Sequence, residues 1–197
     1  MKKIILASTS PRRKEMLKMI GLKFKVDANG HEEKRRHGLS PRTLARLLSR
    51  EKAKSAAVRH KNALIIAADT FIVFKGKLFG KPHKKEEALR MLLTLNGKAH
   101  TVITGFTIID TAGGKIISRS AKTKVWFKKL TADEIKSYVK SGEPLDKAGG
   151  YAVQGRGAFL IKKIEGDFLN VVGLPLRMLI KSLREFGVCT LNSYGII

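Results

Sequence analysis

Cysteine, acidic residues and long apolar runs are scarce in this chain, and each scarcity narrows the classes of protein to consider. The one cysteine, Cys189, excludes an internal disulfide and a cysteine-rich metal site, and it is typical of a reducing cytoplasm. No run approaches the roughly 18 apolar residues of a membrane span. The apolar stretch that follows the first two lysines is too short for a signal peptide. We therefore expect a cytoplasmic protein with no membrane partner.

Several catalytic and metal-binding motifs are also missing. The five histidines are scattered without metal-ligand spacing, which argues against a zinc site. There is no Gly-x-Ser-x-Gly elbow, so a covalent serine mechanism is unsupported. The segment 76–82 (GKLFGKP) is one residue short of a P-loop and lacks the Ser or Thr after its lysine, although Lys81 can still place a charge on a phosphate.

The deficit of acidic residues gives the chain a strong positive charge. It has 16 acidic against 40 basic residues, a net charge of +24. Such a field attracts polyanions, so nucleic acids and nucleotides are both natural partners, but a solvated basic surface explains the charge equally well. Arg42, Arg46 and Arg50 are spaced by four and share one helix face. This stripe is either solvated or a nucleic-acid contact.

The pattern of apolar residues predicts an α/β fold with a mixed sheet. A chain of 197 residues with 43% hydrophobic content is long enough for one domain, or one domain with a lobe. Strands and helices intermingle, and hairpins argue against a purely parallel sheet. The predicted strands are 3–7, 64–68, 71–74, 101–109, 115–127, 151–153 and 158–164. The predicted helices follow Ser10 and Ser40, and span 84–95, 131–141 and 174–186.

The segment Ser8–Arg13 is the first candidate for binding an anion. Ser10-Pro11 is an N-cap followed by proline at the first helical position, directly after an apolar strand. A helix N-terminus presents unpaired amides and the positive end of the helix dipole. Hydroxyls and two guanidinium groups add donors suited to phosphate oxygens. The alternative is an ordinary capped helix with exposed arginines.

Asp69 and Gln154 are the other candidates for chemistry. Asp69 follows the apolar run 64–68, so we expect it at a strand end, where it can bind a divalent cation, take a proton from water, or simply cap a turn. Gln154 lies in the glycine-framed segment 149–157, and its amide can both donate to and accept from a base edge. Read alone, it is a surface glutamine.

Taken together, these segments resemble the Maf family of nucleoside triphosphate pyrophosphatases. The resemblance runs from Ile4 to about Leu183. Its motifs are ASTSPRR (7–13), ADT (68–70), GKP (80–82), HTVITG (100–105), the segment 142–157 and IEGDFLNVVGLP (164–175). It implies an inosine-triphosphatase-like α/β fold, with a mixed twisted sheet flanked by helices and a central cleft. It also implies a single domain, 1–197, with two lobes around that cleft.

The resemblance further implies an activity and the residues that perform it. The activity is hydrolysis of a nucleoside triphosphate to its monophosphate and pyrophosphate, with Mg²⁺ or another divalent cation such as Mn²⁺ or Co²⁺. Asp69 matches the proton acceptor, which would also hold the metal with Glu32. Ser8, Arg13, Lys52 and Lys81 match positions around the phosphates. Arg12, Thr70 and Gln154 match positions that choose the base, and their combination is similar to the subgroup acting on dTTP and UTP. Relatives suggest a homodimer.

Two rival hypotheses remain open. One is a nucleic-acid-binding module, motivated by the charge and the arginine stripe, although no aromatic RNA-binding signature or zinc finger supports it. The other is an interaction protein that regulates cell division, which the resemblance also implies. Both can coexist with an enzyme.

Overall fold

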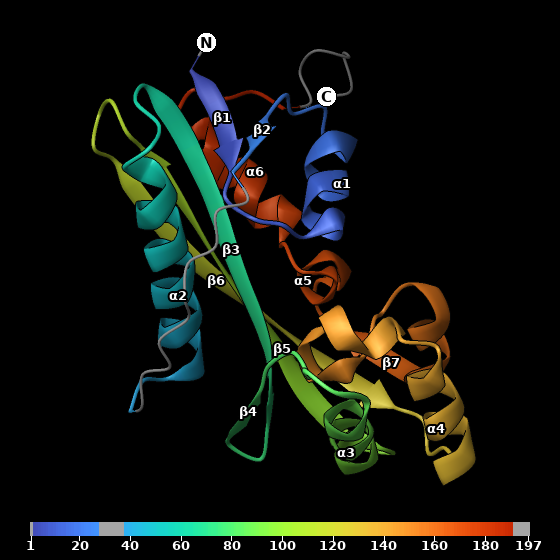
Figure 1. The fold of residues 1–197 in the computed structure, drawn as a ribbon. Helices are drawn as coiled ribbons and strands as arrows, with labels where there is room; N and C mark the ends of the chain where they lie inside the picture. The colour runs from blue at the N-terminus through green and yellow to red at the C-terminus, as the bar shows by residue number, and fades with distance from the viewer. Residues whose placement is uncertain (1, 28–37, 191–197) are drawn as a thin grey trace. The chain divides into compact units, whose positions relative to one another are not determined.

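A mixed β-sheet flanked by helices organises the computed structural model, which describes residues 2–27 and 38–190 (Figure 1). Within those residues the sheet has seven strands in the order β2-β1-β3-β5-β6-β7, and β4 pairs with β3. β1 is parallel to β2 and β3, whereas β4 is antiparallel to β3 and β7 is antiparallel to β6. The predicted α/β class with a mixed sheet is therefore confirmed.

The elements follow the chain in a simple order. The strands are β1 (Lys3–Leu6), β2 (Lys25–Val26), β3 (Ala63–Phe74), β4 (Lys77–Phe79), β5 (Ala99–Asp110), β6 (Ile116–Phe127) and β7 (Ile161–Glu165). The α-helices are α1 (Pro11–Met19), α2 (Pro41–Ala57), α3 (Lys85–Leu95), α4 (Ala132–Lys140), α5 (Phe168–Val172) and α6 (Leu176–Arg184). Three 3₁₀ segments are η1 (Glu143–Asp146), η2 (Ala148–Gly150) and η3 (Gly155–Leu160).

The chain divides into two compact units. Unit 1 comprises Met1–Asp69, Thr104–Ala121 and Gly173–Ile197, and unit 2 comprises Thr70–Ile103 and Lys122–Val172. Strands β3, β5 and β6 contribute residues to both units. The boundary in β3 falls between Asp69 and Thr70, two residues that the sequence analysis assigned to chemistry.

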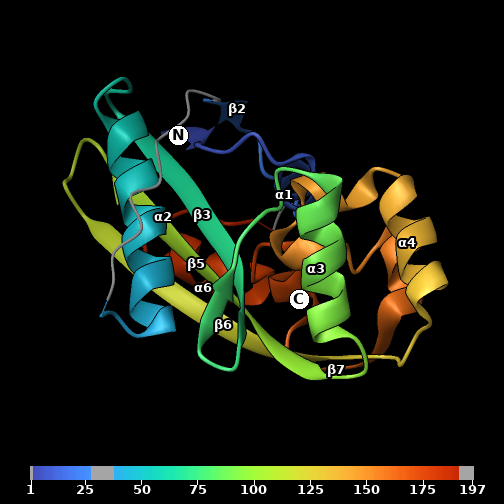
Figure 2. The same cartoon turned by 60° about the horizontal axis from the view of Figure 1, so that its bottom comes forward.

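The core of unit 1 joins helix α2 to the sheet. Alternate residues of β3, beginning with Ala63 and Ile65, pack with Ala53 and Ala56 of α2. Figures 1 and 2 show α2 running alongside β3. Helix α2 also approaches strand β5 closely. A Cβ on Gly105 of β5 would lie 2.1 Å from the carbonyl oxygen of Ala45 in α2. Glycine at this position therefore lets the helix and the strand approach each other.

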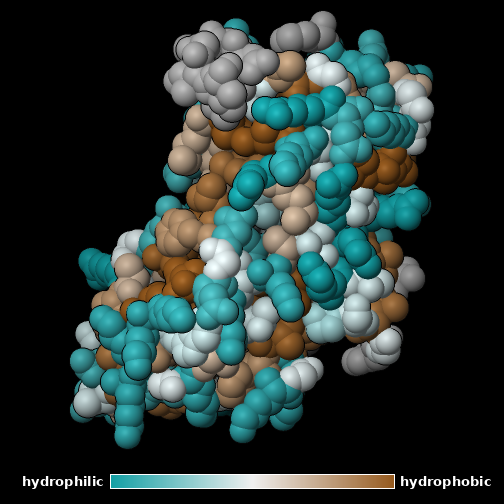
Figure 3. Space-filling view, turned by 180° about the vertical axis from the view of Figure 1, so that it is seen from behind, coloured by the Kyte–Doolittle hydropathy of each residue, from teal (hydrophilic) through white to brown (hydrophobic). Residues whose placement is uncertain are grey.

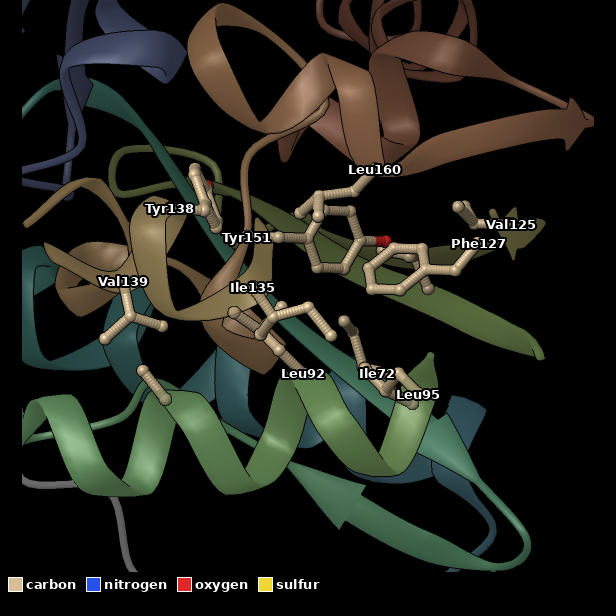
Figure 4. Close-up of a cluster of buried hydrophobic side chains, with 12 residues drawn as sticks. Ile72, Leu92, Leu95, Val125, Phe127, Ile135, Tyr138, Val139, Tyr151 and Leu160 are labelled. Atoms are coloured by element: carbon tan, nitrogen blue, oxygen red, sulfur yellow. The ribbon is translucent and has the colours of Figure 1, made fainter. Parts of the chain in front are cut away.

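The core of unit 2 gathers aromatic and aliphatic side chains from α3, α4, the sheet and the 3₁₀ segments (Figure 4). His100, Phe127 and Tyr151 make mutual edge-to-face contacts, with ring centroids 4.8 to 5.4 Å apart. Helices α3 and α4 also contact each other. Edge-to-face packing contributes about 0.5–1.5 kcal/mol per pair beyond the area buried, which favours one fixed arrangement of the rings.

Three local predictions differ from the structure. The runs 64–68 and 71–74 belong to one continuous strand, β3, because Asp69 and Thr70 do not interrupt the pairing. Residues 151–153, predicted as a strand, form no strand. The predicted strand 158–164 is confirmed only from Ile161, as β7, because η3 occupies Gly155–Leu160 after a tight turn at Gly155, whose φ is 73°. The N-caps Ser10 and Ser40 and the Thr131–Glu134 capping box are confirmed.

A pH-dependent stability follows from His100. Its side chain is buried, its Nε2 lies 2.6 Å from the Tyr151 hydroxyl, and its Nδ1 has no hydrogen-bond partner among the described residues. Burial lowers the pKa of His100 from 6.5 to about 4. The unfolded chain therefore binds the proton first as the pH falls. The stability contributed by neutral His100 is complete above pH 6.5 and is lost towards pH 4, a loss of about 3 kcal/mol.

Urea unfolding of the protein and of His100→Gln between pH 4 and pH 7.5 checks this prediction. The pH dependence of the free energy of unfolding should be shallower in the variant by about the same 3 kcal/mol. His83→Gln, at an exposed position, is the control and should keep the original slope. Parallel profiles for the protein and His100→Gln would show that His100 does not set this dependence.

Candidate active site

The turn after β1 builds the start of helix α1 from serine side chains. Ser10 is the N-cap, its Oγ accepts a hydrogen bond from the Arg13 amide at 3.5 Å, and Pro11 occupies the first turn. The Ser10 amide donates in turn to the Ser8 Oγ at 3.3 Å. This arrangement opens the helix N-terminus with hydroxyl groups, and such an end favours an anion.

Arg13 is fixed at this helix end by contacts from two parts of unit 1. Its Nε donates to the carbonyl oxygen of Gly173 at 2.9 Å, and its Nη1 donates to the Ser8 Oγ at 3.2 Å. A guanidinium group held by its own hydrogen bonds loses little conformational entropy when it meets a ligand. Arg12 precedes Arg13 in α1, and the two guanidinium groups make this helix end strongly positive. The site suits a phosphate group.

Asp69 forms an ion pair with Lys52 of α2. Asp69 is only 6% exposed, and the Lys52 side chain is 19% exposed. Because side chains alternate along a strand, the β3 residues that pack on α2 are followed on the same face by Asp69. The lysine offsets much of the cost of burying the carboxylate and fixes its orientation.

The turn that leads to α1 follows β1, and Asp69 lies in β3, the strand that pairs with β1 in unit 1. In the register of β1 and β3, Leu6 lies opposite Ile66, and the Ala7 amide donates to the Ile66 carbonyl oxygen at 2.8 Å. Because the strands are parallel, Ser8 and Asp69 both follow this pair at the carboxyl end of β1. A positive helix start and a carboxylate that both follow this pair of residues could together bind a phosphate and activate a nucleophile.

The predicted residues of unit 2 lie in three segments. Thr70 is the next residue of β3 after Asp69 and is half-buried. Lys81 is exposed in the segment after β4, and the carbonyl oxygen of its neighbour Gly80 accepts from the Gly149 amide at 2.8 Å. Gln154 is exposed immediately before η3. The hydrogen bond between Gly80 and Gly149 joins the segment that carries Lys81 to η2. The last residue of η2, Gly150, lies four positions before Gln154.

The expectation for Asp69 is corrected in one respect, and the role of Glu32 is not tested. Asp69 does not end a strand but lies within β3, where the ion pair with Lys52 makes a buried carboxylate tolerable.

Glu32 lies outside the described residues. Within residues 2–27 and 38–190, no three acidic, histidine or cysteine side chains form a group that could hold a metal ion. Over the same ranges, no helix is long and apolar enough to cross a membrane.

The arginine stripe is exposed along helix α2. Arg42, Arg46 and Arg50 are all solvent-accessible, and Arg46 donates to the Thr43 hydroxyl at 3.3 Å. Figure 3 shows that hydrophilic side chains are spread over one face of the molecule, with smaller apolar areas between them. These observations fit a solvated surface and a polyanion-binding surface alike.

One contact of the site was not predicted from the sequence. The Gly173 carbonyl that holds Arg13 lies 160 positions away from it, and no local pattern indicates the pairing. The only signal was that Gly173 falls within the last of the family-like motifs, 164–175. The fixed orientation of Arg13 is therefore a product of tertiary structure.

Comparisons with known proteins agree on one family. The family model described as "Maf-like protein" matches residues 3–186. The dTTP/UTP pyrophosphatase of Methanosarcina barkeri is 51% identical over 189 residues, which cover 95% of this chain and 96% of the relative. The enzyme of the same name from Carboxydothermus hydrogenoformans is 49% identical over 185 residues, covering 94% and 99%. The solved structure of the Staphylococcus aureus Ham1 protein superimposes with a TM-score of 0.53 at 15% identity, covering 94% of this chain and 97% of that one, and supports the fold alone.

The Lys52–Asp69 pair predicts a measurable coupling energy. Lys52→Met removes the ammonium group that pairs with a buried carboxylate and should destabilise the protein by about 3 kcal/mol. The double variant Lys52→Met/Asp69→Asn should regain part of this loss, giving a coupling energy of about 1–3 kcal/mol in a double-mutant cycle measured by urea unfolding.

The exposed pair Lys163–Glu165 of β7 is the matched control for this cycle. Both of its side chains are more than 60% exposed. Lys163→Met and Glu165→Gln should therefore give a coupling energy below about 1 kcal/mol in the same kind of cycle. Equal coupling energies at the two pairs would contradict the assignment of a buried, orienting ion pair.

Proposed function

The chain belongs to the Maf family, and on this basis we propose that it is a nucleoside triphosphate pyrophosphatase acting on dTTP and UTP. The reaction releases the nucleoside monophosphate and pyrophosphate. The observation that carries the proposal is the buried carboxylate of Asp69, paired with Lys52 in the unit that also contains the serine-capped, arginine-bearing start of α1. The names of relatives that share about half of its residues support the choice of dTTP and UTP.

The start of α1 binds phosphate oxygens in this proposal. The helix dipole, the Ser8 hydroxyl and the Arg13 guanidinium all present positive or donor groups there. The triphosphate carries heavy negative charge, so catalysis depends mainly on positioning and on stabilising the leaving pyrophosphate. Because Arg13 is already held by Gly173, it needs little reorganisation when substrate binds.

Asp69 orients the attacking water and accepts its proton. The water oxygen forms a bond to the α-phosphorus, the bond from that phosphorus to the bridging oxygen breaks, and pyrophosphate leaves. The ion pair with Lys52 fixes the direction of this carboxylate, and a general base must be correctly oriented to accept the proton. Asp69→Asn removes the basic group while preserving the size of the side chain.

The Asp69 carboxylate is suited to help hold a divalent cation such as Mg²⁺ together with the substrate. Magnesium is commonly held by one or two carboxylates together with substrate phosphates and water, so the oxygens of Asp69 are suitable ligands. Glu32 stays a predicted second ligand. When bound, such a cation neutralises phosphate charge and polarises the scissile bond. Mn²⁺ and Co²⁺ are alternatives of similar charge.

The remaining roles are assigned from the family resemblance. Lys81 places a charge on the phosphates, and Arg12, Thr70 and Gln154 choose the base. The exposed amide of Gln154 can donate and accept at a pyrimidine edge, which supports its part in this choice. The homodimer and the cytoplasmic location also stay predictions.

Nucleic-acid binding is the second candidate function. The specific observation in its favour is the exposed stripe Arg42, Arg46 and Arg50 on α2, in a chain with a net charge of +24. A basic helix face binds phosphate backbones with an affinity that falls steeply with salt. Such binding does not exclude the enzyme.

A pyrophosphate-release assay tests the proposed activity. With Mg²⁺ and a panel of canonical and modified nucleoside triphosphates, the protein should release pyrophosphate from dTTP and UTP in preference to the others. Asp69→Asn should lower kcat/KM by a factor of about 10² to 10⁴, because it removes the general base. Asp133→Asn, on the exposed first turn of α4, is the control and should keep full activity.

Other outcomes of this assay separate the alternatives. Near-normal turnover by Asp69→Asn would refute the mechanistic assignment. Activity only on other nucleotides would keep the chemistry and reject the substrate choice. No release from any nucleotide, together with a salt-sensitive complex with DNA, would favour nucleic-acid binding.

Removal of divalent cations should abolish the activity. Treatment with EDTA followed by desalting should reduce pyrophosphate release to background, and added Mg²⁺, Mn²⁺ or Co²⁺ should restore it, because the phosphate charge is otherwise unneutralised. The same treatment without EDTA is the control. Full turnover in excess EDTA would contradict a metal-assisted reaction.

A further inference from the structure

The carboxylate of Glu143 accepts three hydrogen bonds in unit 2. Its Oε1 accepts from the Tyr138 hydroxyl at 3.0 Å and from the Gly157 amide at 3.0 Å. Its Oε2 accepts from the Arg156 amide at 3.1 Å. Hydrogen bonds to a carboxylate are about twice as strong as those between neutral groups. One side chain therefore binds two consecutive amides of the segment that begins with Gln154.

Glu143 is itself anchored to the core of unit 2. Helix α4 ends before Gly142, whose φ of 76° turns the chain, and the Glu143 amide donates to the Ser141 Oγ at 3.3 Å. Its partner Tyr138 is a core residue of α4, only 4% exposed and labelled in Figure 4. The Tyr138 hydroxyl also accepts from the Ala152 amide at 3.2 Å. The Glu143 carboxylate holds the segment after Gln154, and the Tyr138 hydroxyl holds the residue Ala152 before it.

The segment 154–157 needs such support because its backbone is irregular. Gly155 has a positive φ of 73°. A Cβ on Gly157 would lie 2.4 Å from the Ala152 carbonyl oxygen and 2.6 Å from the Tyr138 hydroxyl, so only glycine fits there. Without Glu143, the amides of Arg156 and Gly157 would lose these acceptors, and the tight turn would lose two hydrogen bonds to the residue that follows α4 and Gly142.

We propose that Glu143 is a positioning residue for Gln154 and thereby sets the base preference of the enzyme. It does not touch the reacting atoms. It holds the backbone directly after Gln154, so that the exposed amide is presented to the base in one orientation. The inference rests on the proposed function, since it assigns a cause to the selectivity of that same site. A preorganised recognition group binds its ligand without an entropic cost of ordering the loop.

Steady-state kinetics of Glu143 variants test the proposal. Glu143→Ala and Glu143→Gln are compared with the unmodified protein on dTTP, UTP and dGTP. Glu143→Ala should raise KM for dTTP about tenfold, leave kcat within about threefold, and reduce the preference for dTTP over dGTP. Glu143→Gln should be intermediate, because its amide keeps one acceptor oxygen but loses the other. Glu165→Gln, which removes the same charge at an exposed position of β7, should change none of these values.

Tyr138→Phe provides a second route to the same answer if Glu143→Ala does not fold. It removes the hydroxyl that donates to Glu143 and should shift KM and base preference in the same direction, by a smaller factor. Urea unfolding of each variant separates loss of fold from loss of selectivity.

Two results would overturn the inference, and they differ. Folded Glu143 variants with unchanged KM and unchanged base preference refute the positioning role while the enzyme remains. An unmodified protein that releases no pyrophosphate from any nucleotide refutes the proposed function, and the inference falls with it.

Discussion

The ion pair between Lys52 and Asp69 is the interaction on which the arrangement of unit 1 depends. Strand β3 is buried along most of its length, and a carboxylate within it would be costly without a nearby cation. Helix α2 supplies that cation because its alanines pack on the same face of β3. The packing of α2 on β3 and the ion pair between Lys52 and Asp69 therefore depend on the same close approach. The small residues let the helix approach, and the approach brings lysine to aspartate.

Much of the fold could be predicted because its signals are local. Ser10-Pro11, Ser40-Pro41 and Thr131–Glu134 mark helix starts through contacts that span only three residues, so the sequence carries the whole cause. The continuity of β3 could not be predicted in this way. Asp69 breaks the apolar pattern, and its ion pair with a lysine 17 positions away, which no local pattern contains, makes a carboxylate tolerable within the strand.

The candidate site also has features that depend on local sequence and features that depend on long-range contacts. The capped, positively charged start of α1 follows from adjacent serines, a proline and arginines. The anchoring of Arg13 by Gly173 depends on contacts between distant parts of the chain, which no local pattern contains. The specific roles of Arg12, Thr70, Lys81 and Gln154 came from the family resemblance and stay predictions, as does a cleft between two lobes. Physical reasoning identifies groups capable of chemistry, whereas their assignment to one substrate needs the comparison.

Glu143 contacts main-chain amides, and this has a consequence for how such an enzyme can diversify. A clamp that binds the backbone is indifferent to the side chains at positions 154 and 156, provided that the glycines between and after them are kept. If Gln154 reads the base as proposed, this residue can be exchanged by a single substitution without rebuilding the turn that presents it. Under that proposal, the fixed backbone leaves the substrate preference open to change at one position.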